Sequence, residues 1–200
     1  MNILLKKKRK ESEYQKTCRA FTIQNSKNTH KLLKKDSKSW HDYHDYRDYS
    51  FKGYDKQDEL PIQIIIKYLE KLQDHKLNIL DLGCGRNLIS KHFESSKTIN
   101  IVGYDHVSFN GSISKDISNL DNVNEQSIDV CIFSQSLMGS NWKEYLDEAK
   151  RVLRYRGEII IVDSVNRYEN IKDYVLQLFK LDCDNYDENK RWFKLHCIKK

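Results

Sequence analysis

A short apolar run at residues 77–82 ends next to an acid and breaks into a glycine-rich turn, Asp81-Leu82-Gly83-Cys84-Gly85. The apolar residues predict a buried strand, and residues 87–94 predict a helix directly after the turn. Backbone N–H groups at the start of a helix bind polar ligands, and glycine lets a ligand approach because it has no Cβ. The turn therefore predicts a ligand site, although an ordinary tight turn has the same pattern.

The spacing of the glycines narrows the choice of ligand. A dinucleotide fingerprint G-x-G-x-x-G needs a glycine where this chain has Leu88, and the phosphate-loop pattern does not occur. A second acid, Asp105, follows the apolar run 99–104, where a carboxylate accepts hydrogen bonds from both hydroxyls of a ribose. These two acids flanking G-x-G resemble motif I of S-adenosylmethionine-dependent methyltransferases, which implies S-adenosyl-L-methionine as the cofactor.

The elements that must position these residues alternate along the chain. A doubly wound α/β sheet is expected from this alternation, and ligands of such sheets bind beyond the carboxyl ends of the strands. Asp81, Asp105, Asp116 and Ser134 all lie at or just after expected strand ends. Strands are expected at 77–82, 99–104, 129–133, 158–162, 179–183 and 192–198, with helices at 61–73, 87–94, 142–153 and 171–178.

The charge of the chain is concentrated at its beginning. Residues 1–40 hold 12 Lys and Arg against 3 Asp and Glu, whereas residues 41–200 hold 23 against 26. We expect residues 1–38 to be a basic, largely disordered arm and residues 39–200 to be one domain that begins with cap helices at 39–76. The arm indicates a polyanionic partner such as nucleic acid, and the alternative is a merely solvated tail. Its cluster Lys6–Lys10 is typical of a nuclear import signal or a nucleic-acid patch.

An aromatic stripe at helical spacing precedes the sheet: Trp40, Tyr43, Tyr46 and Tyr49. We expect it to pack a cap helix on the domain, and the alternative is a platform on which a base stacks. His41 and His44 have no further ligand nearby, and no cysteine has zinc spacing, so no metal site is expected. The five cysteines are interpreted as reduced thiols, and the sequence predicts neither a signal peptide nor a membrane span.

The segment after the expected strand at 129–133 indicates the family more closely. Its run Ser136-Leu137-Met138-Gly139-Ser140-Asn141 is similar to the S-L-M-G-T-N run of the ribosomal RNA-processing protein 8 (nucleomethylin) family. The resemblance covers roughly residues 40–200. Further segments that resemble the family are Tyr43-His44, Pro61 with Ile65-Ile66 and Leu69, residues 148–153, Ser164 with Arg167 and Glu169, and Asn189 with Trp192-Phe193 and Lys199-Lys200.

The resemblance implies a mostly parallel, seven-stranded sheet of the class I methyltransferase type with an N-terminal helical cap. It implies an enzyme of the nucleus or nucleolus that methylates N1 of an adenine in large-subunit ribosomal RNA, reached through the basic arm and the pocket rim. A viral or non-eukaryotic chain would instead be cytoplasmic. The cofactor-binding residues that the resemblance implies are His44, Asp81, Gly83, Gly85, Asp105, Asp116, Ile117 and Ser134. Ser134 and Ser136 are the candidates on the acceptor side.

Some positions depart from the family pattern. Arg86 stands where the family usually has an acid, Gln135 replaces an apolar residue, and residues 154–157 keep only one glycine of the family's K-P-G-G turn. Arg86 either pairs with the cofactor carboxylate or disturbs that contact. Two alternatives therefore remain: a methyltransferase for a small molecule or a protein, and a non-catalytic adaptor that keeps the fold. The target nucleotide and the oligomeric state stay open.

Overall fold

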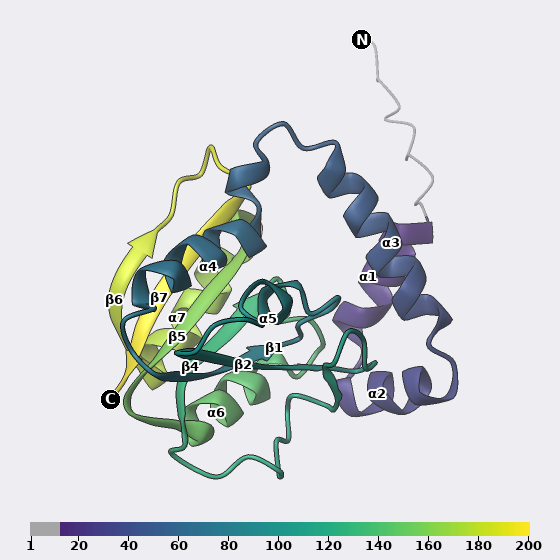
Figure 1. The fold of residues 1–200 in the computed structure, drawn as a ribbon. Coiled ribbons are helices and arrows are strands. Elements are labelled where there is room, and N and C mark those ends of the chain that lie inside the picture. The colour runs from purple at the N-terminus through teal and green to yellow at the C-terminus, as the bar shows by residue number, and fades with distance from the viewer. Residues whose placement is uncertain (1–12) are drawn as a thin grey trace.

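The structure is a computed structural model that describes residues 13–200 (Figure 1). Its centre is a seven-stranded sheet with the order β3-β2-β1-β4-β5-β7-β6. The first five strands run parallel, and β7 is antiparallel to both β5 and β6. The expected α/β class and the mostly parallel sheet are confirmed. The strands are β1 Leu77–Leu82, β2 Ile99–Asp105, β3 Ile113–Ser114, β4 Ile128–Ser134, β5 Leu153–Ser164, β6 Phe179–Asn185 and β7 Trp192–Lys199.

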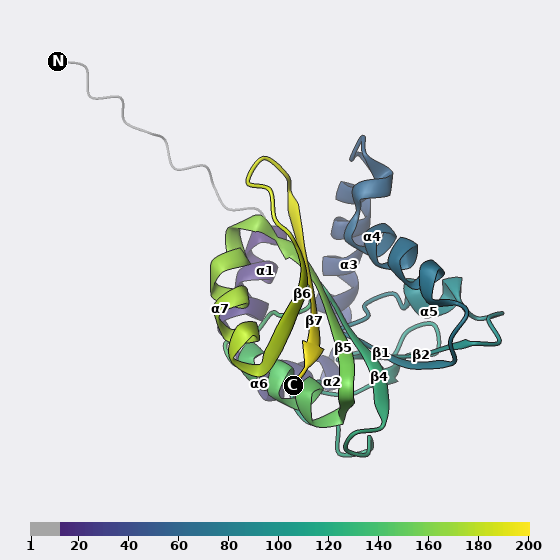
Figure 2. The ribbon, with the colours of Figure 1, turned by 90° about the vertical axis from the view of Figure 1, so that its left-hand side faces the viewer.

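Helices cover both faces of this sheet, as Figure 2 shows. On one face α4 (Pro61–Leu69) and α5 (Leu88–His92) bury Ile65, Leu69 and Ile89. On the other face α6 (Trp142–Val152) and α7 (Tyr168–Leu178) bury apolar side chains such as Leu146 and Ile171. Apolar residues at helical spacing thus face the sheet from both sides, which gives three layers. Short 3₁₀ turns lie at Gln57–Glu59, Glu70–Leu72 and Val165–Arg167.

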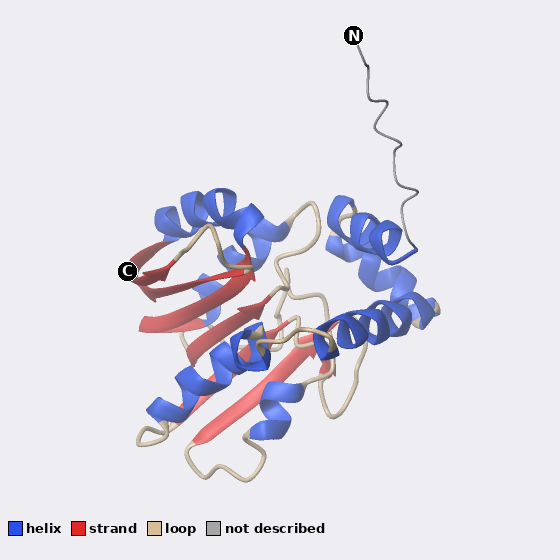
Figure 3. Ribbon diagram, turned by 90° about the horizontal axis from the view of Figure 1, so that it is seen from above, coloured by secondary structure: helices blue, strands red, loops and turns tan. Residues whose placement is uncertain are grey.

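Three further helices stand beside the sheet as a separate group (Figure 3). They are α1 (Glu13–Ile23), α2 (Ser26–Lys35) and α3 (Lys38–Lys52), and they lie close to the strand ends that the glycine-rich turn follows. We call these three helices the cap. The cap helix expected to carry the aromatic stripe corresponds to α3.

The expectation of disorder is wrong for residues 13–35, which form α1 and α2. Ser26, Thr29 and Leu33 form a buried face of α2 at helical spacing, and the side chain of Asn25 caps the helix by accepting a hydrogen bond from Lys27 N. Two of these three buried residues are polar, so the sequence shows no apolar period there. The Lys6–Lys10 cluster lies outside the described residues.

Several element boundaries also differ from expectation, among them the starts of β5 and α7. β5 begins at Leu153 rather than residue 158, because Leu153 pairs with Ile128 and an irregularity in the register then joins this end to the rest of the strand. Arg156 adopts φ 60° within this irregularity. α7 begins three residues earlier than expected, at Tyr168. The five cysteines are free, and none of the described helices is long and apolar enough to cross a bilayer.

Candidate functional site

A pocket lies between the cap and the carboxyl ends of β1, β2 and β4. It contains about 680 Å³ of empty space, part of which is open to solvent. All three cap helices contribute to its wall, so residues 13–52 are part of the site and not an appendage. Its lining comprises Phe21, Ser26, Thr29, Leu33, Trp40, Tyr43, His44, Arg47, Gly83, Asp105, His106, Lys115, Ile117, Ser134, Gln135, Ser136, Met138, Gly139 and Tyr145.

The glycine-rich turn passes directly under two pocket side chains. Gly83 and Gly85 have φ values of 78° and 55°, in the left-handed region that favours glycine. A Cβ on Gly83 would stand 2.4 Å from Cβ of Ser136, and a Cβ on Gly85 would stand 2.6 Å from Cε1 of His44. Both the backbone angles and the close contacts therefore require glycine here.

Asp105 joins the turn to the cap. Its Oδ1 accepts hydrogen bonds from Trp40 Nε1 and from the backbone N of His106, each over 2.7 Å. Its Oδ2 accepts from the backbone N of Gly85 over 2.8 Å. The carboxylate therefore lies in the pocket wall, in contact with α3 on one side and with the turn on the other.

Asp81 lies behind the pocket wall and does not line it. The residue is 1% exposed, and its Oδ1 has no hydrogen-bond partner. Burial raises the pKa of the Asp81 carboxyl to about 7, and the nearby Asp105 adds to the rise while Arg47 opposes it. An acid with this pKa changes its charge near neutral pH.

His44 lines the pocket from α3, against the ring of Trp40. Burial is the main cause that lowers the pKa of the His44 imidazole to about 2, and the charges of Arg47 and Arg86 contribute to this shift. The ring is therefore neutral at pH 7, and its buried Nδ1 has no hydrogen-bond partner. A neutral imidazole with a free nitrogen offers a polar contact to a ligand without a charge.

Asp116 and Ile117 are adjacent in sequence but have different roles. Ile117 lines the pocket, whereas Asp116 does not. Asp116 Oδ2 accepts a hydrogen bond from Ser26 Oγ over 3.0 Å, and its Oδ1 accepts from Ser118 N. Asp116 therefore holds α2 against the strand ends.

The segment after β4 forms another part of the wall. Ser134, Gln135 and Ser136 all line the pocket, and Gln135 has φ 56°, which is unusual for a residue other than glycine. The backbone N of Gln135 donates to Val162 O over 2.8 Å, which holds this conformation. The Ser136 hydroxyl is buried and has no hydrogen-bond partner. Both acceptor-side candidates thus face the same cavity.

Arg86 does not lie in the pocket. Its guanidinium forms ion pairs with Asp45 and Asp48 of α3 and lies over the ring of Phe109, 4.8 Å from the ring centroid. The departure from the family at this position therefore fastens α3 to the glycine-rich turn. Neither of the two effects expected for Arg86 at the cofactor carboxylate is what the structure shows.

Of the predicted cofactor-binding residues, the structure brings most to one cavity and places the others just outside it. His44, Gly83, Asp105, Ile117 and Ser134 line the pocket, and Asp81, Gly85 and Asp116 do not. The sequence reasoning missed the α1 and α2 residues of the wall and Arg47. It placed Trp40 and Tyr43 in a packing stripe, with a platform for a base as the alternative, and both side chains line the cavity. Within the same stripe Tyr49 is 77% exposed.

Comparisons with known proteins identify the family. A family model described as "Hypothetical methyltransferase" matches residues 5–200. The 25S rRNA (adenine(645)-N(1))-methyltransferase of Schizosaccharomyces pombe is 32% identical over 120 residues, which are 56% of this chain and 37% of that protein. Ribosomal RNA-processing protein 8 of Arabidopsis thaliana is 36% identical over 122 residues, 58% of this chain and 40% of that protein. The expected resemblance is confirmed, but the chain spans well under half the length of these relatives.

Solved structures agree with the fold. A TehB-like SAM-dependent methyltransferase from Corynebacterium glutamicum covers 82% of this chain and is itself covered completely, with a TM-score of 0.64 and 14% identity. The 1,6-didemethyltoxoflavin-N1-methyltransferase of Burkholderia thailandensis, solved with S-adenosylhomocysteine, has a TM-score of 0.61 and 15% identity, over 84% of this chain and 87% of that one. At these identities the likeness shows the fold alone.

Proposed function

The chain belongs to the methyltransferase family whose model it matches over residues 5–200, and from this premise we propose that it methylates N1 of an adenine in ribosomal RNA. The observation that carries the proposal is the pocket at the strand ends, which combines a glycine-rich turn with Asp105 and Ser134. Relatives named as rRNA adenine-N1-methyltransferases supply the substrate class.

The residues of the pocket fit S-adenosylmethionine. Bound there, the cofactor supplies an electrophilic methyl group. Asp105 is the residue for the ribose hydroxyls, Ile117 for the adenine, and Gly83 for the methionine part. His44 Nδ1 and Ser136 Oγ are buried polar atoms without partners, as expected of groups that meet a polar ligand. Asp81, Gly85 and Asp116 support this set from behind: Gly85 N binds Asp105, and Asp116 holds α2.

The acceptor side needs alignment more than proton transfer. N1 of adenine has an in-plane lone pair, so no base has to remove a proton before it attacks a methyl group. The neutral His44 and the hydroxyls of Ser134 and Ser136 suit this requirement, because none of them carries a charge that would need screening. Alignment and exclusion of water are the contributions that such a pocket makes. The target base must be unpaired or flipped out, since N1 is engaged in a Watson–Crick pair.

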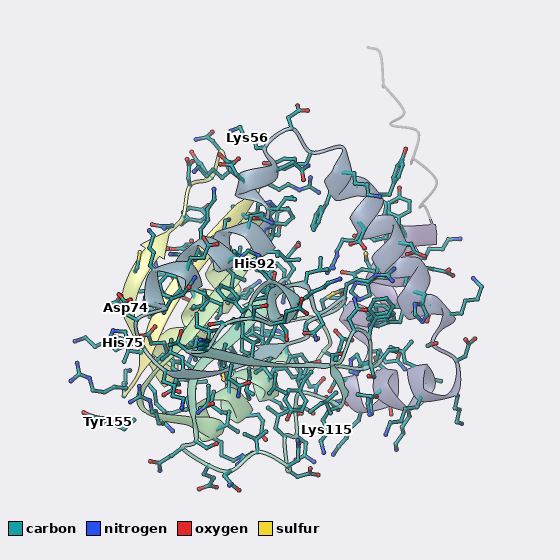
Figure 4. All side chains as sticks on the ribbon, viewed as in Figure 1. Lys56, Asp74, His75, His92, Lys115 and Tyr155 are labelled. Atoms are coloured by element: carbon teal, nitrogen blue, oxygen red, sulfur yellow. The ribbon has the colours of Figure 1, made fainter. Side chains whose placement is uncertain are left out.

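The outer face of α2 supports an RNA partner. Lys27, Lys31, Lys34 and Lys35 are exposed, and none has an ion-pair partner within residues 13–200. The inner face of the same helix lines the pocket through Ser26, Thr29 and Leu33. Lys115 also lines the pocket, and Figure 4 labels it on the side of the molecule where α2 lies. Phosphate contacts from the four lysines of α2 would set affinity and orientation without reading sequence, whereas Lys115 is paired with Asp121.

The substrate class also supports a subcellular localisation. The named relatives are eukaryotic rRNA-processing proteins, which supports a nuclear and nucleolar enzyme. The basic cluster Lys6–Lys10 agrees with nuclear import.

The test is incubation of the full chain with methyl-labelled S-adenosylmethionine and large-subunit rRNA, followed by nucleoside analysis. We expect label in N1-methyladenosine, and none with the variant Asp105→Ala. Label in total protein or in a small-molecule extract, with unlabelled RNA, would instead assign the small-molecule or protein alternative. Binding of the cofactor without label in any fraction would identify an adaptor.

A further inference from the structure

Arg47 is a largely buried cation in the pocket wall, and among residues 13–200 its Nε has no hydrogen-bonded partner. It lies on α3 one turn after His44 and lines the same cavity. Its side chain is 11% exposed, and its Nε is buried and forms no hydrogen bond. The nearest carboxylate is that of Asp48, 3.7 Å from Nε, which is beyond hydrogen-bond distance.

Asp48 is not available to neutralise Arg47 alone. Its carboxylate also faces Arg86, whose Nε lies 3.4 Å from Oδ2. Arg86 is further paired with Asp45, so two acids of α3 neutralise Arg86. Arg47 has the long contact with Asp48 and lies over the ring of Phe51, 5.8 Å from its centroid, and neither contact is a hydrogen bond to an anion. A guanidinium presents five N–H donors in a planar fork, and its burial without an anion is costly. The guanidinium of Arg47 therefore has no close anionic partner among the described residues, and an anionic ligand in the pocket would supply one.

The position of the guanidinium specifies which part of a ligand it meets. One terminal nitrogen of Arg47 lies 3.3 Å from the position that a Cβ on Gly85 would occupy. The guanidinium therefore lies next to the glycine-rich turn. The opposite part of the pocket, near Ile117 and α2, is where the adenine is proposed to lie. An elongated ligand with its ribose at Asp105 would extend its other end towards Arg47.

We propose that Arg47 binds the carboxylate of the amino-acid part of the cofactor through the fork of its guanidinium. This inference rests on the proposed cofactor and adds a residue that neither the relatives' names nor the sequence motifs indicate. A carboxylate matches the paired N–H groups of a guanidinium, and the low exposure of the site strengthens the pairing. A phosphate of the RNA is the other anion of matching chemistry, but a side chain that is 11% exposed lies below the rim of the pocket.

Two ligands that differ in the carboxylate test the assignment. S-adenosylhomocysteine carries the amino-acid part, and 5′-methylthioadenosine has the same adenine, ribose and thioether without it. By calorimetry, Arg47→Met should lose about 10- to 100-fold in affinity for S-adenosylhomocysteine, the range that corresponds to a hydrogen bond to a charged group. Its affinity for 5′-methylthioadenosine should stay within about twofold of wild type, because no carboxylate is lost. Arg47→Lys keeps a charge but not the planar fork of N–H donors. Its affinity for S-adenosylhomocysteine should therefore lie between those of wild type and Arg47→Met.

Arg154→Met is the matched control. It removes the same charge at Arg154, which pairs with Asp129 outside the pocket wall. We expect this variant to bind both ligands as wild type does. Thermal unfolding of all variants shows whether each is folded before binding is compared.

The possible outcomes separate this inference from the proposed function. Equal losses of Arg47→Met for both ligands would mean that Arg47 only supports the cap, and unchanged affinity for both would mean that it contacts neither; each result overturns the assignment. Unchanged affinity for S-adenosylhomocysteine with weaker RNA binding would assign Arg47 to a phosphate and also overturn it. Wild-type protein that binds neither ligand would overturn the cofactor itself, and this inference with it.

Discussion

The indole N–H of Trp40 donates a hydrogen bond to Oδ1 of Asp105 over 2.7 Å, which ties the cap to the end of β2. Backbone N–H groups of His106 and Gly85 take two more of the acceptor positions on this carboxylate. A carboxylate offers about four such positions, so two ribose hydroxyls need one that is already used. Trp40 is the side chain among the three donors, and its bond is therefore the one a ligand can replace.

Replacement of Asp105 by alanine should abolish binding of S-adenosylhomocysteine in calorimetry. Two charge-assisted hydrogen bonds to the ribose contribute about 1.5–3 kcal/mol each, which corresponds to at least a hundredfold loss. The control Asp129→Ala removes an acid whose Oδ2 accepts from Asn78 N, outside the pocket wall. Unchanged affinity of Asp105→Ala would refute the ribose assignment.

The variant Trp40→Phe should separate stability from binding. Loss of the indole donor should lower the free energy of unfolding by about 1.5–3 kcal/mol, the range for a hydrogen bond to a charged group. Affinity for S-adenosylhomocysteine should not fall, because Asp105 then has a free acceptor position. Urea unfolding and calorimetry measure the two quantities. A loss of affinity comparable to that of Asp105→Ala would show that Trp40 itself holds the ligand.

Asp81 should make the stability of the protein depend on pH. Its pKa is about 7 in the folded chain against an ordinary value of 3.8, so between these values the folded state holds a proton that the unfolded state has released. Protonated Asp81 therefore stabilises the folded wild-type protein at low pH. The free energy of unfolding falls as this stabilisation is lost between about pH 4 and 7, by at most about 1.4 kcal/mol per pH unit. Above that window the effect is constant.

The comparison with Asp81→Asn isolates this effect. Both proteins contain His44, whose lowered pKa acts in the opposite direction, since its proton is lost on folding and stability falls as pH drops below 6.5. That contribution cancels in the difference. We expect the unfolding free energy of Asp81→Asn to rise relative to wild type between pH 4 and 7 and then to level off. A difference that is independent of pH would show that Asp81 does not titrate in this window.

Asn141 should control the docking of the cap. Its Oδ1 accepts a hydrogen bond from Ser26 N over 2.9 Å, and its Nδ2 donates to Ser26 Oγ over 3.0 Å. Asn141→Ala leaves the backbone N–H of Ser26 without a partner, while Ser26 Oγ keeps its hydrogen bond to Asp116 Oδ2, and the loss costs about 1–3 kcal/mol. Amide hydrogen exchange in residues 13–35 should accelerate, while exchange in β4 and β5 stays slow. The exposed Asn189→Ala serves as control, and slow exchange of α2 in Asn141→Ala would mean that other contacts suffice.

The lysines of α2 should contribute to the slope of RNA affinity against salt concentration. Each phosphate contact with single-stranded RNA contributes about 0.7 to the slope of log affinity against log salt. Lys27→Gln with Lys31→Gln and Lys34→Gln should therefore reduce the slope by about 2 while cofactor affinity is unchanged. Replacement of Lys56, which Figure 4 labels on the segment after α3, is the matched control. An unchanged slope would place the RNA on another face.

The sequence was sufficient for the parts of the site that a single segment defines. An apolar strand that ends next to an acid and a glycine turn is a local pattern, and it located Asp81, Gly83, Gly85 and Asp105. Residues of the cap were not found in the same way. Trp40 meets Asp105 across 65 positions, and Ser26 meets Asn141 across 115. Contacts between residues so far apart in sequence produce no periodic pattern of apolar residues. The inner face of α2 is largely polar, so it lacks the apolar spacing by which a docked helix is recognised.

That separation also fixes the order in which the protein can be completed during synthesis. The helices that wall the cavity leave the ribosome before the strands, and the contacts of α2 are complete only after both Asp116 and Asn141 have emerged. Their short lengths make them marginal on their own in water. The docking of α2 is therefore complete only after the 115 positions between Ser26 and Asn141 have been translated, and the cavity closes only after β4 is made.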